Sequence, residues 1–68
     1  MNVLLNGEPR WLGDRALVAD AVEATGAEPE GRGLAVAVDG EVVPRGDWRR
    51  VELRDGQRVE VLRAVQGG

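Results

Sequence analysis

The sequence predicts an α+β fold in which one helix packs on one face of a small β-sheet. Two dipeptides, Asn6-Gly7 and Asp39-Gly40, are strong signals for two-residue hairpin turns, because their residues tolerate the positive φ that such turns need. Residues 16–25 carry apolar side chains at helical spacing. The chain has 68 residues, which is enough for one small domain with a single core.

The first hairpin is predicted from residues 3–5, which are apolar and suited to a strand, and from residues 10–12 after the first turn signal. Pro9 cannot donate a ladder hydrogen bond, so the returning strand is expected at an edge of the sheet. Trp11 lies on this strand, and the sequence leaves open whether its side chain points into the core.

The helix is predicted over residues 16–25, about three turns. Its apolar stripe consists of Leu17, Val18, Ala21, Val22 and Thr25. Asp14 is the predicted N-cap, because a carboxylate can accept hydrogen bonds from the free N–H groups of the first turn. Gly26 stands where a helix favours a left-handed residue after its last turn.

Short strands separated by turns are predicted for the second half of the chain. Residues 27–33 are rich in Glu, Pro and Gly and are expected to form a loop. Residues 34–38 are apolar throughout, which predicts a strand buried on both faces. Residues 41–43 are expected to pair with it up to a stop at Pro44. Residues 45–50 predict a turn or a short 3₁₀ helix, with Trp48 packed against the core.

The last strand is predicted over residues 58–65, after a short extended segment at 51–53 and a turn at Asp55-Gly56. Val59 and Val61 are expected to face the helix, because the side chains of a strand alternate. The same alternation turns four residues away from the helix: Arg58, Glu60, Leu62 and Ala64.

Leu62 would then be an exposed aliphatic residue shortly before the end of the chain. Isolated exposed leucines are ordinary on protein surfaces. The alternative is that Leu62, together with Leu4 on the outer side of the first strand, anchors partner proteins. The sequence leaves both interpretations open.

The composition lacks the side chains that most enzymes use. Histidine, cysteine, serine, lysine and tyrosine are absent, and Thr25 is the single threonine. These residue types supply most nucleophiles, general bases and metal ligands. The composition therefore argues against an enzyme that works alone and against a metal site.

Charge and hydropathy exclude further classes. Nine basic residues face twelve acidic ones, which gives a net charge of −3 and disfavours nucleic acid, whose binding depends mostly on neutralising phosphates. Arg49 and Arg50 form the one adjacent basic pair. No apolar run approaches the roughly 18 to 20 residues of a membrane span, and no signal segment is recognised. We expect a cytoplasmic protein that binds neither nucleic acid nor membrane.

The sequence ends in Gln66-Gly67-Gly68. One interpretation is a frayed terminus, since terminal glycines are often disordered. The other is that the α-carboxylate of Gly68 is itself the reactive group and needs no side chain. Glycine has no Cβ to block a narrow channel, and three extended residues reach roughly 10 Å into a partner enzyme.

The sequence resembles the ThiS family, the sulfur carrier proteins of thiamine biosynthesis, over nearly the whole chain. The residues that carry the resemblance are Asn6-Gly7-Glu8, residues 17–22, residues 35–45 with Val43-Pro44-Arg45, Trp48, residues 53–56, residues 59–61 and residues 64–68. Three positions depart from the family pattern: Leu17 replaces the usual Ser or Thr at the helix cap, Asp39 a common Asn, and Gln57 a common Asp. The resemblance implies a ubiquitin-like β-grasp fold, with a mixed sheet of four to five strands. It also implies one domain over residues 1–65 and a flexible tail over residues 66–68.

By this resemblance, Gly68 is the residue that is adenylated and converted to a thiocarboxylate, and Gly67 is the slim residue behind it. The implied partners are an E1-like, ThiF-type adenylating enzyme that consumes ATP, a ThiG-type thiazole synthase, and a sulfur donor such as a cysteine desulfurase relay. The protein itself is expected to bind no cofactor. Ala64 and Gln66 join Leu62 and Leu4 in the predicted partner-contact set.

Two other functions stay open at this point. One is a sulfur carrier of the molybdopterin-synthase small-subunit type, which shares the fold and the tail but usually has a longer chain. The other is a β-grasp interaction module whose tail is incidental.

Overall fold

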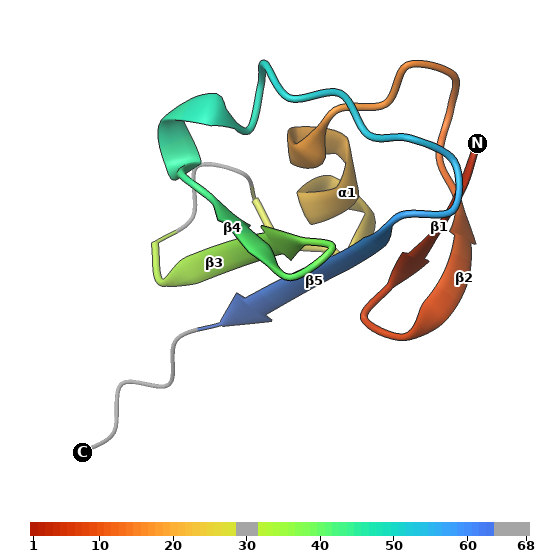
Figure 1. Cartoon of the computed structure of the whole chain (residues 1–68). Coiled ribbons are helices and arrows are strands. Elements are labelled where there is room, and N and C mark those ends of the chain that lie inside the picture. The colour runs from red at the N-terminus through yellow and green to blue at the C-terminus, as the bar shows by residue number, and fades with distance from the viewer. Residues whose placement is uncertain (29–31, 64–68) are drawn as a thin grey trace.

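The computed structural model describes residues 1–28 and 32–63. In chain order the elements are β1 (Asn2–Leu5), β2 (Glu8–Trp11), α1 (Val18–Ala24), β3 (Leu34–Val38), β4 (Glu41–Val43), the 3₁₀ turn η1 (Arg45–Asp47) and β5 (Arg58–Arg63). They form one sheet with α1 on one side of it (Figure 1).

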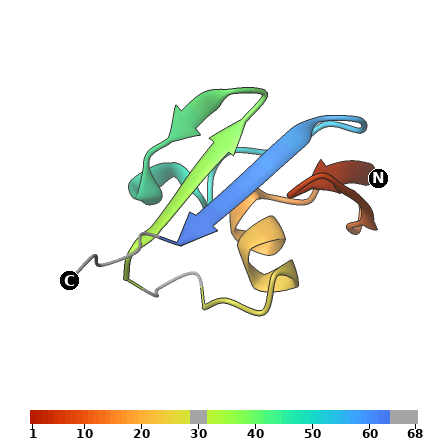
Figure 2. The same cartoon turned by 90° about the horizontal axis from the view of Figure 1, so that it is seen from below.

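The sheet is mixed and has five strands in the order β2-β1-β5-β3-β4. β5 is the central strand: it pairs in parallel with β1 and antiparallel with β3. Viewed from below, α1 lies against one face of the sheet, and the opposite face carries no described element (Figure 2). The predicted arrangement of one helix on one face of a mixed sheet is confirmed.

Both predicted hairpin turns form for the expected reason. Asn6 and Gly7 have φ values of 51° and 84°, and Asp39 and Gly40 have 49° and 85°. These are the positive values that match a tight turn to the twist of the two strands it joins. The returning strand β2 begins at Glu8, two residues earlier than predicted, and Pro9 lies on an edge strand as expected.

The predicted N-cap of the helix is wrong. Asp14 lies in a turn, Arg15 after it has a φ of 59°, and the helix begins only at Val18 with Leu17 as N-cap. The side chain of Leu17 cannot accept a hydrogen bond, so main-chain carbonyls from elsewhere satisfy the first turn. Val18 N–H donates to Val51 O at 3.0 Å, and Ala19 N–H donates to Trp48 O at 2.9 Å.

These bonds place residues 48–53 across the start of α1. Leu53 N–H donates back to Ala16 O at 2.8 Å, and Leu17 forms an isolated bridge with Glu52. The extended segment predicted at residues 51–53 is therefore a cap for the helix and pairs with no strand of the sheet. The Asp20 carboxylate completes the cap by accepting from Leu17 N–H at 2.7 Å.

The C-terminal end of α1 follows the prediction. Gly26 has a φ of 88°, and its N–H donates to Glu23 O at 2.9 Å. Arg10 on β2 donates through Nη2 to Ala24 O at 2.8 Å, so a cation lies at the carbonyl end of the helix, where the helix dipole favours it.

The core lies between α1 and the inner face of the sheet. Its buried side chains are Val3, Leu5, Leu12, Ala16, Val18, Ala19, Ala21, Val22, Val36, Val38, Trp48, Leu53, Val59 and Val61. Trp48 is only 2% exposed and donates through Nε1 to Val43 O at 2.9 Å. Its predicted packing against the core is confirmed, and η1 is the short 3₁₀ turn expected in this region.

The prediction that residues 34–38 are buried on both faces is wrong. Val36 and Val38 are buried, whereas Ala35 is exposed and Ala37 is partly exposed. The reason is that α1 covers one face only, and small alanines tolerate the uncovered face. The last strand is described up to Arg63, so the predicted residues 64 and 65 lie outside the described residues.

We predict that Val59→Ala lowers the free energy of unfolding by about 2 kcal/mol, because the Val59 side chain is fully buried on the central strand. The exposed neighbour supplies a matched control: Leu62→Ala should change the same free energy by less than about 0.5 kcal/mol. Urea unfolding of both variants measures the difference. Equal losses would show that the inner and outer sides of β5 are assigned wrongly.

Asp39 links the second hairpin to the start of β5. Its Oδ1 accepts from Arg58 N–H at 3.0 Å, and its Oδ2 accepts from Gln57 Nε2 at 3.1 Å. The hydrogen bond from the Arg58 backbone, with that from Gln57, holds the pKa of the Asp39 carboxyl below its ordinary value. The ionised form therefore stabilises the fold above the unfolded pKa of about 3.9, and this contribution is lost as the pH falls through the lowered pKa.

Asp39→Asn should remove this part of the acid sensitivity, because the amide keeps an oxygen for Arg58 N–H and has no proton to gain. We expect the thermal midpoints of wild type and variant to differ more at pH 6 than at pH 3, and to converge on acidification. Thermal unfolding across that range measures this. A constant difference at every pH would contradict the assigned role of the carboxylate.

Candidate functional site: the helix-free face of the sheet

The sheet face opposite α1 is called the outer face here. Alternation along each strand and the pairing register assign its members: Asn2, Leu4, Pro9, Trp11, Ala35, Ala37, Val42, Arg58, Glu60 and Leu62. Among the described residues, no helix or loop covers these side chains (Figures 1 and 2). The outer face is therefore uncovered in the described part of the chain.

Four large apolar side chains are exposed in the described part of the chain, and all four lie on the outer face. The exposed fractions are 38% for Leu4, 59% for Leu62, 65% for Trp11 and 74% for Val42. Single exposed leucines are common, but four large apolar residues gathered on one uncovered face are typical of an interaction surface.

Leu4 and Leu62 were predicted from alternation alone, and the structure places both on the outer face as expected. It does not bring them into contact. Leu4 lies opposite Arg58, whereas Leu62 lies opposite Ala35, four residues further along β5. At about 3.3 Å per residue this separates them by about 13 Å along the strand, so they mark two parts of one face.

Sequence reasoning left the side of Trp11 open and missed Val42 as a member of this surface. Trp11 lies opposite Asn2, two residues before Leu4 on β1, so the hairpin register turns its side chain outward. Val42 lies opposite Ala37. Both placements follow from the two hairpin turns once the residues that pair are known, so the signal was present in the sequence.

The predicted tail residues Ala64, Gln66, Gly67 and Gly68 lie outside the described residues. The structure describes the strand that leads to them, up to Arg63. The direction of the chain at that point is set by β5, because this strand stays in register with β3 up to Arg63. The outer-face residue nearest to the tail in sequence is Leu62.

Asn6 holds the last part of β5 in place. β1 ends at Leu5, and beyond this point the Asn6 side chain replaces the missing main chain: its Oδ1 accepts from Val61 N–H at 2.8 Å. Asn6 thus has two roles, because it also supplies the positive φ of the first turn.

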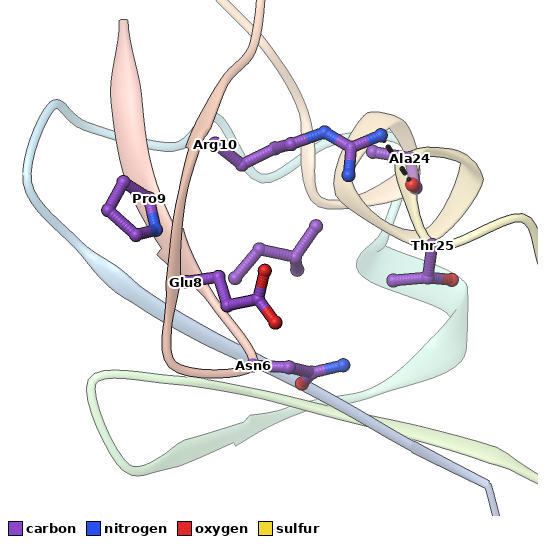
Figure 3. A pocket seen from close by; sticks show the side chains of 7 residues that line it. Asn6, Glu8, Pro9, Arg10, Ala24 and Thr25 are labelled. Atoms are coloured by element: carbon purple, nitrogen blue, oxygen red, sulfur yellow. Dashed lines mark hydrogen bonds between the residues drawn. The ribbon is translucent and has the colours of Figure 1, made fainter.

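A hollow of about 250 Å³ lies on the helix side of the first hairpin, lined by Leu5, Asn6, Glu8, Pro9, Arg10, Ala24 and Thr25 (Figure 3). Arg10 reaches across it to the carbonyl of Ala24 at the end of α1 (Figure 3). No pair of its side chains forms a nucleophile with a base. We interpret this hollow as a packing gap between the first hairpin and the end of α1, and not as a catalytic site.

Within residues 1–28 and 32–63, no group of three or more His, Cys, Asp or Glu side chains is placed to hold a metal ion. No helix in the same ranges is long and apolar enough to cross a membrane.

A five-stranded mixed sheet, with a central strand parallel to the first strand and one helix on one face, is the β-grasp fold of ubiquitin-like proteins. The class is thus a small ubiquitin-like β-grasp protein.

The model described as the ThiS family matches residues 3–68, and the chain belongs to this family of small sulfur carrier proteins of thiamine biosynthesis. It is similar to the crystal structure of the thiamine biosynthesis protein ThiS from Geobacter metallireducens, with 30% identity, a TM-score of 0.75, and all of both chains covered. It is also similar to the solution structure of a thiamine biosynthesis protein from the same organism, with 30% identity, a TM-score of 0.73, and 100% and 88% of the two chains covered. No curated protein matches the chain.

Proposed function

We propose that this protein carries sulfur on its C-terminal residue, Gly68, as a thiocarboxylate that supplies the sulfur of the thiazole ring in thiamine biosynthesis. The observation that carries the proposal is the ThiS family match, which runs through residue 68 and so includes Gly67-Gly68. The similarity to proteins described as thiamine biosynthesis proteins favours this pathway over the molybdopterin one.

The chemistry explains why a partner enzyme is needed. A carboxylate is a poor electrophile, because its oxygen is a poor leaving group. When the carboxylate of Gly68 attacks the α-phosphorus of ATP, pyrophosphate leaves and an acyl adenylate forms. Sulfur at the level of hydrosulfide can then attack the carbonyl carbon and expel AMP, which leaves the thiocarboxylate. The ATP belongs to an E1-like, ThiF-type partner, and we propose no cofactor for the carrier itself.

The chain contributes no reactive side chain to these steps. The sequence has no Cys, His, Ser or Lys, so the terminal carboxylate has no competing nucleophile of those types in the same molecule. What the fold supplies is position: β5, in register with β3, fixes the described chain up to Arg63, directly after the outer-face residue Leu62. We propose that Gly67 and Gln66 enter the partner's channel, where the missing Cβ of glycine is an advantage.

We propose that the partners recognise the outer face. The partners are the adenylating enzyme, a ThiG-type thiazole synthase that takes the sulfur, and a sulfur donor such as a cysteine desulfurase relay. Leu62 is the apolar residue of this face nearest to the tail, and Leu4 and Trp11 extend the surface toward β2. The sequence predicts that Ala64 joins this surface. Burying such side chains is the usual source of binding energy in a small interface. A cytoplasmic location remains a prediction.

We predict that incubation with ATP, the adenylating enzyme and a sulfur source raises the mass of the intact protein by one sulfur-for-oxygen exchange. Removal of Gly68 should abolish the gain, because the new terminal residue is displaced by one position in the partner's channel. Intact-protein mass spectrometry measures both. Two controls omit ATP and the sulfur source in turn.

A mass gain that persists without Gly68 would contradict its role as the sulfur-bearing residue. If the wild-type protein shows no gain while the enzyme is active on another carrier, the protein is a β-grasp interaction module and the proposal fails. Co-purification with thiazole synthase rather than with the large subunit of molybdopterin synthase identifies the pathway.

We predict that Leu62→Glu weakens binding to the adenylating enzyme by about tenfold or more, because a charge replaces an apolar anchor in a desolvated contact. Val42→Glu is the matched control: it places the same charge on the same face, two strands away on the edge strand β4. We expect a clearly smaller loss for the control. Titration calorimetry measures both dissociation constants, and unchanged affinity for Leu62→Glu would remove Leu62 from the interface.

A further inference from the structure

The central strand β5 has an uneven hydrogen-bonding environment along its length. Main-chain groups of its odd-numbered residues point toward β1, as shown by the bond from Asn6 N–H to Val59 O at 2.9 Å. Those of its even-numbered residues point toward β3, as shown by the bond from Asp39 N–H to Arg58 O at 2.8 Å. This alternation assigns each remaining group of the strand to one side.

β1 is too short to cover its side of β5. It ends at Leu5, which lies opposite Val59, whereas β5 continues to Arg63. The Asn6 side chain takes up Val61 N–H. Beyond it, the Val61 carbonyl and the Arg63 N–H point toward the vacated position, and no group in the described ranges bonds to them there.

The outer strands of the sheet are less open to another strand. On the edge strand β2, the main-chain groups of Pro9 face away from β1. Proline has no N–H, so one donor is missing from that edge. β4 is only three residues long. The gap beside residues 61–63 is as short as β4, but no proline removes a donor from it.

We propose that one extended segment of the adenylating enzyme adds to the sheet as a strand beside residues 61–63, in the position that β1 leaves vacant. Its N–H donates to the Val61 carbonyl, and its carbonyl accepts from Arg63 N–H. This inference rests on the proposed function and deepens it by naming the mode of recognition.

The position of this edge in the chain identifies the occupant. Gly68 is only the fifth residue after Arg63, a reach of about 17 Å when extended. An enzyme that acts on the carboxylate of Gly68 must bind the preceding residues in an extended conformation. A strand of the enzyme that pairs with Arg63 would begin to hold the chain in this way. Alternation gives the added strand an apolar side chain beside Leu62 on the outer face, and a polar side chain toward Asn6 and Glu8 on the other (Figure 3).

Arg63→Pro tests the inference with a single change, because it deletes the outward N–H and leaves the β3 ladder intact. Arg63→Ala is the matched control, since it removes the same side chain and keeps the N–H. We expect titration calorimetry with the adenylating enzyme to show about tenfold weaker binding for Arg63→Pro than for Arg63→Ala. Thermal unfolding should give the two variants similar midpoints.

Amide hydrogen exchange of the unmodified protein gives a readout that needs no variant. Arg63 N–H should exchange fast in the free protein and be protected in the complex with the adenylating enzyme. Leu62 N–H faces β3 and should be protected in both states. Equally fast exchange of Arg63 N–H with and without the enzyme would overturn the inference.

The outcomes separate this inference from the proposed function. Equal binding of Arg63→Pro and Arg63→Ala, with sulfur still loaded on Gly68, overturns the added strand and leaves the carrier function standing. Absence of binding by the wild-type protein overturns the proposed function and the inference with it. A self-association seen by sedimentation that Arg63→Pro abolishes, with enzyme binding unchanged, would assign the edge to a second copy of this chain and overturn the inference.

Discussion

The two-sided alternation of β5 is the constraint on which the rest of the structure depends. Val59 and Val61 fill the core against α1, while Leu62 stands on the uncovered face. The same strand is paired on both sides near its start and leads directly to the tail. A shift of one residue in its register would bury Leu62 and expose the valines. The core and the outer face therefore both depend on this one strand.

The features that the sequence predicts correctly are those decided by local chemistry. Asn6-Gly7 and Asp39-Gly40 form their turns because their backbone conformation suits these residues, and Gly26 ends the helix for the same reason. Alternation placed Leu4 and Leu62 on the outer face because each strand has a period of two. The resemblance to the ThiS family, carried by short motifs along the chain, is confirmed by the family match.

The features that could not be predicted depend on distant parts of the chain. Asp14 was the best cap in its own neighbourhood, but the carbonyls of Trp48 and Val51 satisfy the helix start, about thirty residues away in sequence. Residues 34–38 are exposed on one side because a single helix covers only one face of the sheet. An apolar run in the sequence does not show how many faces of a strand are covered. The pairing of β1 with β5, and the gap left beside Val61, likewise need the three-dimensional arrangement.

In the proposed function, a protein with no Cys, His, Ser or Lys offers one terminal group to the enzymes that bind its outer face. Fragment-ion mass spectrometry of the sulfur-loaded protein tests this most directly, because the chain carries twelve acidic side chains besides its terminal carboxylate. The account predicts that all of the added sulfur lies in the fragment that ends at Gly68. Sulfur found on any Asp or Glu side chain, with Gly68 unchanged, would contradict it.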